Sequence, residues 1–172
     1  MQRPPITRTV ICAVLVTFIL FALLTHGALA ADADGKTTDE MMRHLASEAV
    51  DIADKSYGIK LDYSTESIQQ VEVVLGKLHD ELQRRKSAEG VRGLAMAFGA
   101  YIGESIRKKV PEAKWDRDHP VAGEKSYPLH WLGGDSFPVG WCFKRIMNGP
   151  EDNVWDKFQV VSKERAERQE TK

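Results

Sequence analysis

Residues 127–143, YPLHWLGGDSFPVGWCF, form the stretch of the chain that is richest in groups able to do chemistry. Tryptophan is often not fully buried and is enriched in binding surfaces, so two tryptophans beside a histidine and an aspartate suggest a ligand groove. The candidate ligand-binding residues combine two indole rings with three titratable groups. They are Glu104, His130, Trp131, Asp135 and Trp141. The alternative interpretation, which stays open here, is that the stretch is hydrophobic core beside a tight turn.

A serine nucleophile is the first chemistry to test in this stretch. Gly134-Asp135-Ser136-Phe137 resembles the opening nucleophile block of the GDSL-type esterases, over four residues only. No histidine follows His130, so the base that such enzymes carry near the C-terminus is missing from its place. Pro138 also stands where a nucleophile elbow needs its second glycine. We therefore expect Asp135 and Ser136 to cap a helix beginning at Pro138, and we name no catalytic residue.

Metal and thiol chemistry have weaker signals. His44 and Glu48 lie four residues apart on one helix face, and a second set of possible ligands is Asp116, Asp118 and His119. The chain has no H-E-x-x-H, no C-x-x-C and no EF-hand spacing, so we predict no metal site and no cofactor. Cys142 falls on an apolar helical stripe, where cysteine behaves as a small hydrophobic residue.

The N-terminus has the layout of a secretory signal peptide. Arg3 and Arg8 precede an apolar run over residues 10–24, and Ala28-Leu29-Ala30 offers the small residues that signal peptidase accepts. This pattern predicts cleavage after Ala30 and a periplasmic or secreted protein. The alternative is an inner-membrane anchor formed by residues 9–25, which would be the only contact with the membrane.

Removal of the first 30 of the 172 residues leaves enough chain for one domain. Two of the 24 basic residues leave with the signal peptide and none of the 25 acidic ones, so the mature chain is slightly acidic. A nucleic-acid partner normally requires a basic face and is not expected. We predict a flexible segment over residues 31–37, a single domain over 38–163 and a charged tail over 164–172.

Three helices are predicted in the first half of this domain. Thr37 and Glu40 have the spacing of a capping box, and apolar residues then recur at helical spacing until Gly58. The predicted apolar stripe of this helix is Met42, Leu45, Ala49 and Ile52. Ser64 is expected to cap a second helix, whose apolar positions step by three and four residues. A third helix is expected over residues 90–109.

Interior glycines distinguish the third helix. Each costs about 1 kcal/mol relative to alanine, so helix propensity does not explain them. Gly99 and Gly103 lie four residues apart on one face. We therefore predict a central helix that another element crosses at close range.

The second half of the domain begins with strands. AKWDRD, SYPLHWL and SFP are rich in aromatic residues and are separated by glycine-containing turns. Tyr127, Leu129 and Trp131 alternate onto one face, which should meet the helices. Pro128 favours an edge strand because it cannot donate to a ladder. Gly133-Gly134 fits a two-residue hairpin turn.

Two helices are expected after these strands. Pro138 suits the first turn of one of them, and Pro150 suits the start of the last. The predicted apolar stripe of the first is Val139, Cys142, Phe143, Ile146 and Met147. Because the strands cluster instead of alternating with helices, the predicted fold is α+β: three helices, a small antiparallel sheet of about three strands and two helices.

The segments LAMAFGAYIGESI, AKWD and YPLHWLGGDSFPVGWCFKRIMNG resemble an uncharacterised family of exported bacterial α+β domains. Its motifs are a small-residue helix, a tryptophan strand and a Phe-Pro-Val helix start, over roughly residues 63–161. This resemblance implies a fold and no reaction. We therefore expect a non-catalytic exported protein that binds another protein or a cell-envelope component, an immunity-type protein being a close variant. The alternative is an envelope-directed hydrolase that uses carboxylates which the sequence does not identify.

Overall fold

A computed structural model describes residues 37–170 of the chain. The chain divides into two units, Met1–Gly35 and Lys36–Lys172. The predicted signal peptide, its alternative as an anchor and most of the predicted flexible segment lie outside the described residues. Among residues 37–170, no helix is both long and apolar enough to cross a membrane.

Helix α2 (Thr38–Tyr57) begins at the predicted capping box. The Thr37 hydroxyl accepts a hydrogen bond from the Glu40 backbone N–H (3.3 Å), and the Glu40 carboxylate accepts one from the Thr37 backbone N–H (2.9 Å). Gly58 ends the helix with a positive φ of 65°, which glycine adopts without steric cost. The buried line runs along Met41, Met42, Ala46, Ala49 and Ala53, so the apolar face is rotated from the predicted one.

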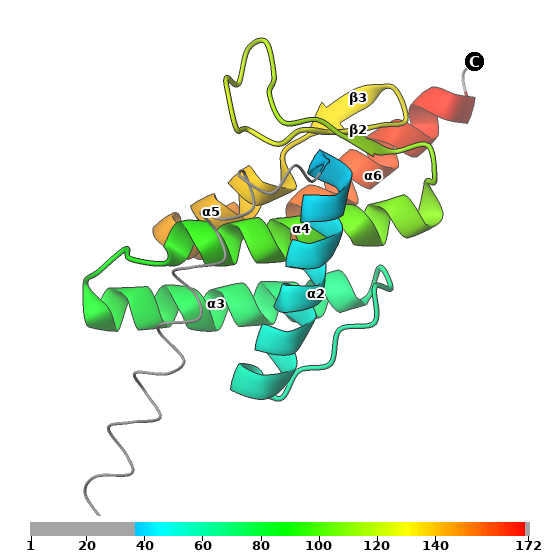
Figure 1. Cartoon of the computed structure of the whole chain (residues 1–172). Helices are drawn as coiled ribbons and strands as arrows, with labels where there is room; N and C mark the ends of the chain where they lie inside the picture. The colour runs from blue at the N-terminus through cyan, green and yellow to red at the C-terminus, as the bar shows by residue number, and fades with distance from the viewer. Residues whose placement is uncertain (1–36, 171–172) are drawn as a thin grey trace, which may run out of the picture. The chain divides into compact units, whose positions relative to one another are not determined.

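Helices α3 (Ser67–Arg85) and α4 (Val91–Lys109) follow as predicted. The N-cap of α3 is Glu66, which makes no side-chain cap, rather than the predicted Ser64. The Ser64 hydroxyl still accepts a hydrogen bond from the Ser67 backbone N–H (3.1 Å), which stabilises the turn that leads into α3. α4 is the central element: α2 crosses it on one side, and α5 packs on the opposite side (Figure 1). Since neighbours cover it from several directions, nearly every residue from Ala95 to Ile106 is buried.

Two of the three glycines of α4, Gly99 and Gly103, admit neighbours of different kinds. A Cβ atom on Gly99 would lie 2.5 Å from the Cα atom of Val139, so the backbone of α5 occupies that place. A Cβ atom on Gly103 would lie 2.0 Å from the Trp115 indole. The predicted close approach is confirmed, by a helix at Gly99 and by an aromatic ring at Gly103.

The sheet is antiparallel with strand order β1-β2-β3. Its strands are β1 (Lys114–Trp115), β2 (Leu129–Trp131) and β3 (Gly134–Ser136). β2 is central, so the edge position predicted from Pro128 is wrong. This proline directly precedes the strand, where no ladder donor is needed, and its carbonyl accepts a hydrogen bond from the Asp116 N–H (3.0 Å).

The β2–β3 hairpin turns one residue earlier than predicted. Trp131 pairs with Gly134, so the two turn residues are Leu132 and Gly133, both with positive φ. Gly134 instead opens β3, where a Cβ atom would lie 3.3 Å from the Arg165 guanidinium. The missing side chain of Gly134 therefore leaves room for a charged group from the last helix.

The C-terminal part contains α5 (Pro138–Asn148), the short 3₁₀ helix η1 (Pro150–Asp152) and α6 (Val154–Glu170). The predicted stripe of α5 is only partly buried, because Cys142 and Ile146 face the core while Phe143 is exposed. Burial raises the pKa of the Cys142 thiol, as expected of a cysteine that serves in packing. The α+β fold and its order of elements agree with the prediction.

Arg145 of α5 is also buried, which the apolar stripe did not indicate. Its Nε donates to Glu72 Oε1 on α3 (2.5 Å), and the other oxygen of Glu72 accepts the backbone N–H of Val154 at the start of α6 (2.9 Å). One carboxylate thus ties three helices together.

Candidate functional site

A cleft of about 790 Å³ opens along α5 and is the candidate binding site. Its walls come from the N-terminal half of α4, from α5, from η1 and α6, and from the loop that precedes β2. Most of the lining is apolar, including Met96, Trp141, Phe143, Val160 and Val161. Clefts of this size with apolar walls are typical of small-molecule sites.

Exposed apolar side chains concentrate at this cleft. Residues 37–170 contain four large apolar side chains that are strongly exposed: Val73, Val121, Phe143 and Val160. Phe143 (42% exposed) and Val160 (57%) both line the cleft. Isolated exposed apolar residues need no explanation, but two that share one concave surface make this cleft the candidate binding surface.

The charges around the cleft are unequal. Four basic residues and two acidic residues belong to its lining: Arg92, Lys125, Lys144, Lys157, Asp152 and Asp156. Lys157 is bound to Asp152 through its ammonium group. Since the chain as a whole has a net charge of −1, the basic excess at the cleft is a local feature.

His119 contacts two residues of the cleft wall. Its Nδ1 accepts hydrogen bonds from the backbone N–H groups of Val121 (3.2 Å) and Ala122 (3.0 Å), and Ala122 lines the cleft. The imidazole also meets the ring of Phe137, another lining residue, edge to face with centroids 5.2 Å apart. His119 therefore positions two parts of the cleft wall.

His119 is in turn held by Asp135, which bridges two histidines. Because Nδ1 of His119 is an acceptor, the ring proton lies on Nε2 and is donated to Asp135 Oδ2 (3.1 Å). His130 Nδ1 donates to the other oxygen, Oδ1 (2.6 Å). His130 and Asp135 thus support the cleft through His119 without lining it.

The hydrogen bond from His130 is the main reason why the pKa of Asp135 lies below its ordinary value. The bond from His119 acts in the same direction, and partial burial opposes both. A depressed carboxyl pKa in the folded state stabilises the protein above the pKa of the unfolded chain. This stabilisation is lost as the pH falls through the folded value.

Asp135→Asn should therefore make the free energy of unfolding less dependent on pH in the acid range. We expect the wild type to exceed the variant by about 1 kcal/mol in free energy of unfolding at pH 6, and we expect this difference to shrink below about pH 4. Urea unfolding between pH 2 and pH 6 measures it. Glu124→Gln, at an exposed position in the neighbouring loop, is the control. A pH-independent difference for Asp135→Asn would contradict the assignment.

Glu104 lies elsewhere, in a packing cluster. Its Oε1 accepts the indole N–H of Trp115 (2.9 Å) and a guanidinium N–H of Arg107 (3.0 Å), and Arg107 also reaches Asp39 on α2 (3.0 Å). This carboxylate therefore orients the indole that packs on Gly103, and it does not line the cleft.

Trp131 and Trp141 have different environments. Trp131 is buried, its indole N–H donates to Ser136 Oγ (3.0 Å), and the Arg165 guanidinium lies 4.2 Å from the ring centroid. Trp141 is half-buried and lines the cleft. Of the five candidate residues, Trp141 contributes to the cleft surface directly, and His130 and Asp135, which are both partly exposed, are linked to its wall through His119.

Ser136 does not cap α5. Its hydroxyl is buried and accepts hydrogen bonds from Trp131 and Arg165, while Phe137 precedes α5 without a side-chain cap. The predicted capping role of Asp135 and Ser136 is wrong. The Asp135 carboxylate accepts hydrogen bonds from two histidines, and the Ser136 hydroxyl accepts them from Trp131 and Arg165, so neither side chain caps α5.

The sequence did not identify the residues that make the surface of the cleft apolar and basic. The predicted apolar stripe of α5 includes Phe143, which is exposed, and no sequence signal marks the exposed Val160 of α6. A helical stripe predicts which residues share a face, but it does not say how far a neighbouring helix covers that face. The exposed basic residues of the lining, Arg92 and Lys144, carry no distinctive sequence signal.

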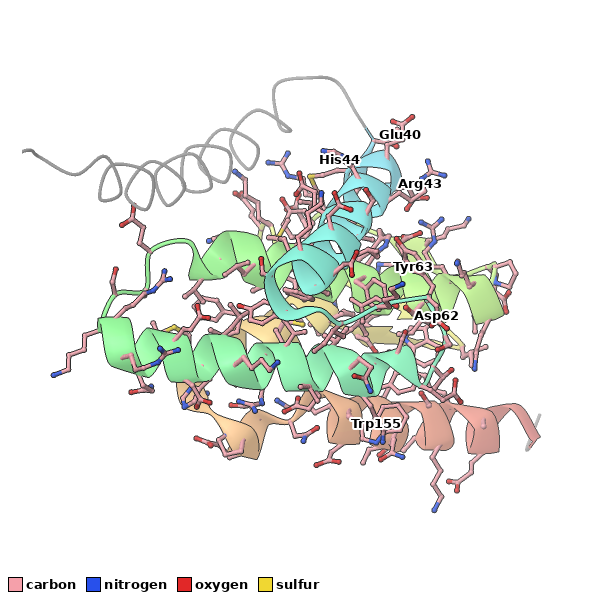
Figure 2. All side chains as sticks on the ribbon, turned by 90° about the horizontal axis from the view of Figure 1, so that it is seen from below. Glu40, Arg43, His44, Asp62, Tyr63 and Trp155 are labelled. Carbon is pink, nitrogen blue, oxygen red and sulfur yellow. The ribbon has the colours of Figure 1, made fainter. Side chains whose placement is uncertain are left out.

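The residues that were weighed as metal ligands make ordinary polar contacts. His44 and Glu48 form an exposed pair 3.4 Å apart on α2, and Figure 2 shows His44 near Glu40 and Arg43. Asp118 accepts the backbone N–H of Lys125 (2.7 Å) in the loop before β2. Within the part of the chain that the structure describes, no group of three or more histidine, cysteine or carboxylate side chains could hold a metal ion.

Comparison with known proteins gives no relative: no family model, no curated protein and no solved structure matches the chain.

Proposed function

We propose that this chain is an exported, non-catalytic binding protein that uses the cleft along α5 to hold a component of the cell envelope, either a protein or a smaller molecule. The observation that carries the proposal is the exposure of Phe143 and Val160 within one concave, mainly apolar lining. Export rests on the layout of the first 30 residues. The resemblance to uncharacterised exported α+β domains is part of the same proposal.

The contacts of the carboxylates favour binding over hydrolysis. A hydrolase of the envelope would need acid and base groups that converge on an open site. Glu104 is bonded to Trp115 and Arg107, and the exposed Asp135 is bonded to two histidines outside the cleft lining. Each of these carboxylates therefore has a role in packing or positioning. Of the two carboxylates that line the cleft, Asp152 is bound to Lys157 and accepts a hydrogen bond from Asn148 (2.6 Å), so only Asp156 offers an unengaged acid group there.

Filling the cleft should abolish binding. Gly140 lines the cleft, and a Cβ atom there would meet only the Cβ atom of Phe137 at an ordinary 3.7 Å, so Gly140→Leu should fold and project into the open space. We expect retention of the envelope component to fall at least about tenfold. The measurement passes an envelope extract of the native host over immobilised mature protein and identifies what is retained by mass spectrometry.

The matched control is Gly93→Leu, the same change on α4 where a Cβ atom would meet nothing within 4 Å. It should retain the component as the wild type does. Equal retention by the wild type and Gly140→Leu would contradict a role for the cleft. Native protein that keeps Met1 and stays in the cytosol would contradict export.

A further inference from the structure

We infer that the cleft binds a single-chain anionic amphiphile, with the hydrocarbon chain along the apolar lining and the anionic head at Arg92 and Lys144. This inference rests on the proposed function and names the class of envelope component. A fatty-acid carboxylate and the phosphate of a lysophospholipid share the required chemistry, and the experiment separates them.

The volume of the cleft favours a small ligand over a protein partner. Specific protein partners usually cover about 800 Å² on each side of an interface, whereas ligand pockets enclose roughly 300–1,000 Å³. The cleft volume of about 790 Å³ lies within that second range, and its lining comes from three α-helices, η1 and a loop. Its lining includes two small residues, Ala95 and Gly140, which take up little of the cleft volume.

The apolar side chains suit a flexible hydrocarbon. Met96 lines the cleft from α4, and the unbranched methionine side chain adapts to irregular apolar shapes. Trp141 contributes a large, rigid face from α5, while Val160 and Val161 contribute branched side chains from α6. A chain of methylene groups gains free energy from each group that it buries, about 0.8 kcal/mol, without needing a hydrogen-bonding partner.

The charges specify an anionic head. Arg92 and Lys144 are both exposed lining residues, and neither makes a hydrogen bond or an ion pair with another residue of the described range 37–170. Lys157, by contrast, is bound to Asp152. Asp156 is the acidic lining residue without such a pair, so basic groups remain in excess. A carboxylate or phosphate placed between apolar walls and these two cations would gain charge-assisted hydrogen bonds.

Tryptophan fluorescence provides a direct test with defined probes. Bromine atoms quench tryptophan on contact, so dibromostearate below its micellar concentration should quench Trp141 in the mature protein. Trp115 and Trp131 are buried, and Trp155 of α6 stacks on Phe158 (centroids 5.8 Å) and is labelled in Figure 2. Trp141→Phe should therefore remove most of the quenching, whereas Trp155→Phe should leave it.

Titration calorimetry with stearate, lysophosphatidylglycerol and neutral monostearoylglycerol measures the role of the head group. The double variant Arg92→Gln/Lys144→Gln should weaken binding of the preferred anionic probe about tenfold and leave monostearoylglycerol unchanged. The control is Arg43→Gln/Lys163→Gln, which changes the net charge equally at exposed positions outside the cleft. Tighter binding of stearate points to a fatty acid, and tighter binding of lysophosphatidylglycerol points to a lysophospholipid.

Val160→Glu provides a second block of the cleft at a position that is 57% exposed and therefore tolerant of a charge. It should weaken the binding of both anionic probes at least about tenfold, as should Gly140→Leu.

Equal affinity for neutral and anionic probes, or an affinity that the double variant does not change, would overturn the inference. Failure of all three probes, with retention of an envelope protein that Gly140→Leu abolishes, would overturn it and leave the proposed function standing. Failure of both assays would overturn both.

Discussion

Arg165→Met should lower the free energy of unfolding by about 3–5 kcal/mol, the largest effect that we expect from one substitution. Arg165 of α6 is only 5% exposed. Its guanidinium donates to the carbonyl oxygens of Trp131, Gly134 (3.1 Å) and Asp135 (2.8 Å), and to the hydroxyl of Ser136 (3.0 Å). Methionine fills similar volume but leaves these acceptors without their donor, and buried acceptors that lose a partner are costly.

Arg165→Lys separates charge from geometry. A lysine ammonium keeps the positive charge but presents a single point instead of a planar fork, so it cannot serve acceptors on both sides of the hairpin turn. We expect it to recover less than half of the loss. Lys163→Met, two residues earlier on the exposed side of α6, should change stability by less than about 0.5 kcal/mol. Chemical denaturation monitored by circular dichroism measures all three, and a loss below about 1 kcal/mol for Arg165→Met would contradict the assignment.

Gly99→Ala should cost about 3 kcal/mol or more, although alanine favours a helix. Its Cβ atom would lie 2.5 Å from the Cα atom and 2.6 Å from the backbone nitrogen of Val139. No rotamer change can relieve a contact with backbone, so α4 and α5 must separate. Because α4 is the central helix, this separation would disturb the core and the cleft that lies along α5.

Gly93→Ala supplies the matched comparison within the same helix. No atom lies within 4 Å of the position that its Cβ atom would occupy, so helix propensity acts without a clash and should stabilise the protein by about 0.5–1 kcal/mol. Thermal unfolding of both variants under one condition measures the opposite signs. A Gly99→Ala variant as stable as Gly93→Ala would show that the two helices are not in contact at this place.

Local signals in the sequence determined the elements of this fold. The capping box of Thr37 and Glu40, the stop at Gly58 and the start of α5 at Pro138 act within four residues, so they can be read without knowing any neighbour. Alternation of Tyr127, Leu129 and Trp131 likewise predicted the buried face of the central strand. The order of helices and strands, and therefore the α+β class, followed from these short-range rules.

Tertiary structure alone decided which polar groups are buried and where the cleft lies. Arg165 belongs to a segment that by composition resembles a charged tail, yet it is buried because the hairpin around Gly134, some thirty residues earlier, presents acceptors to it. Phe143 lies on an apolar stripe, yet it is exposed because neighbouring helices leave that face uncovered. Periodicity specifies a side chain's direction from its own helix. Contacts between distant segments determine whether protein or water meets it.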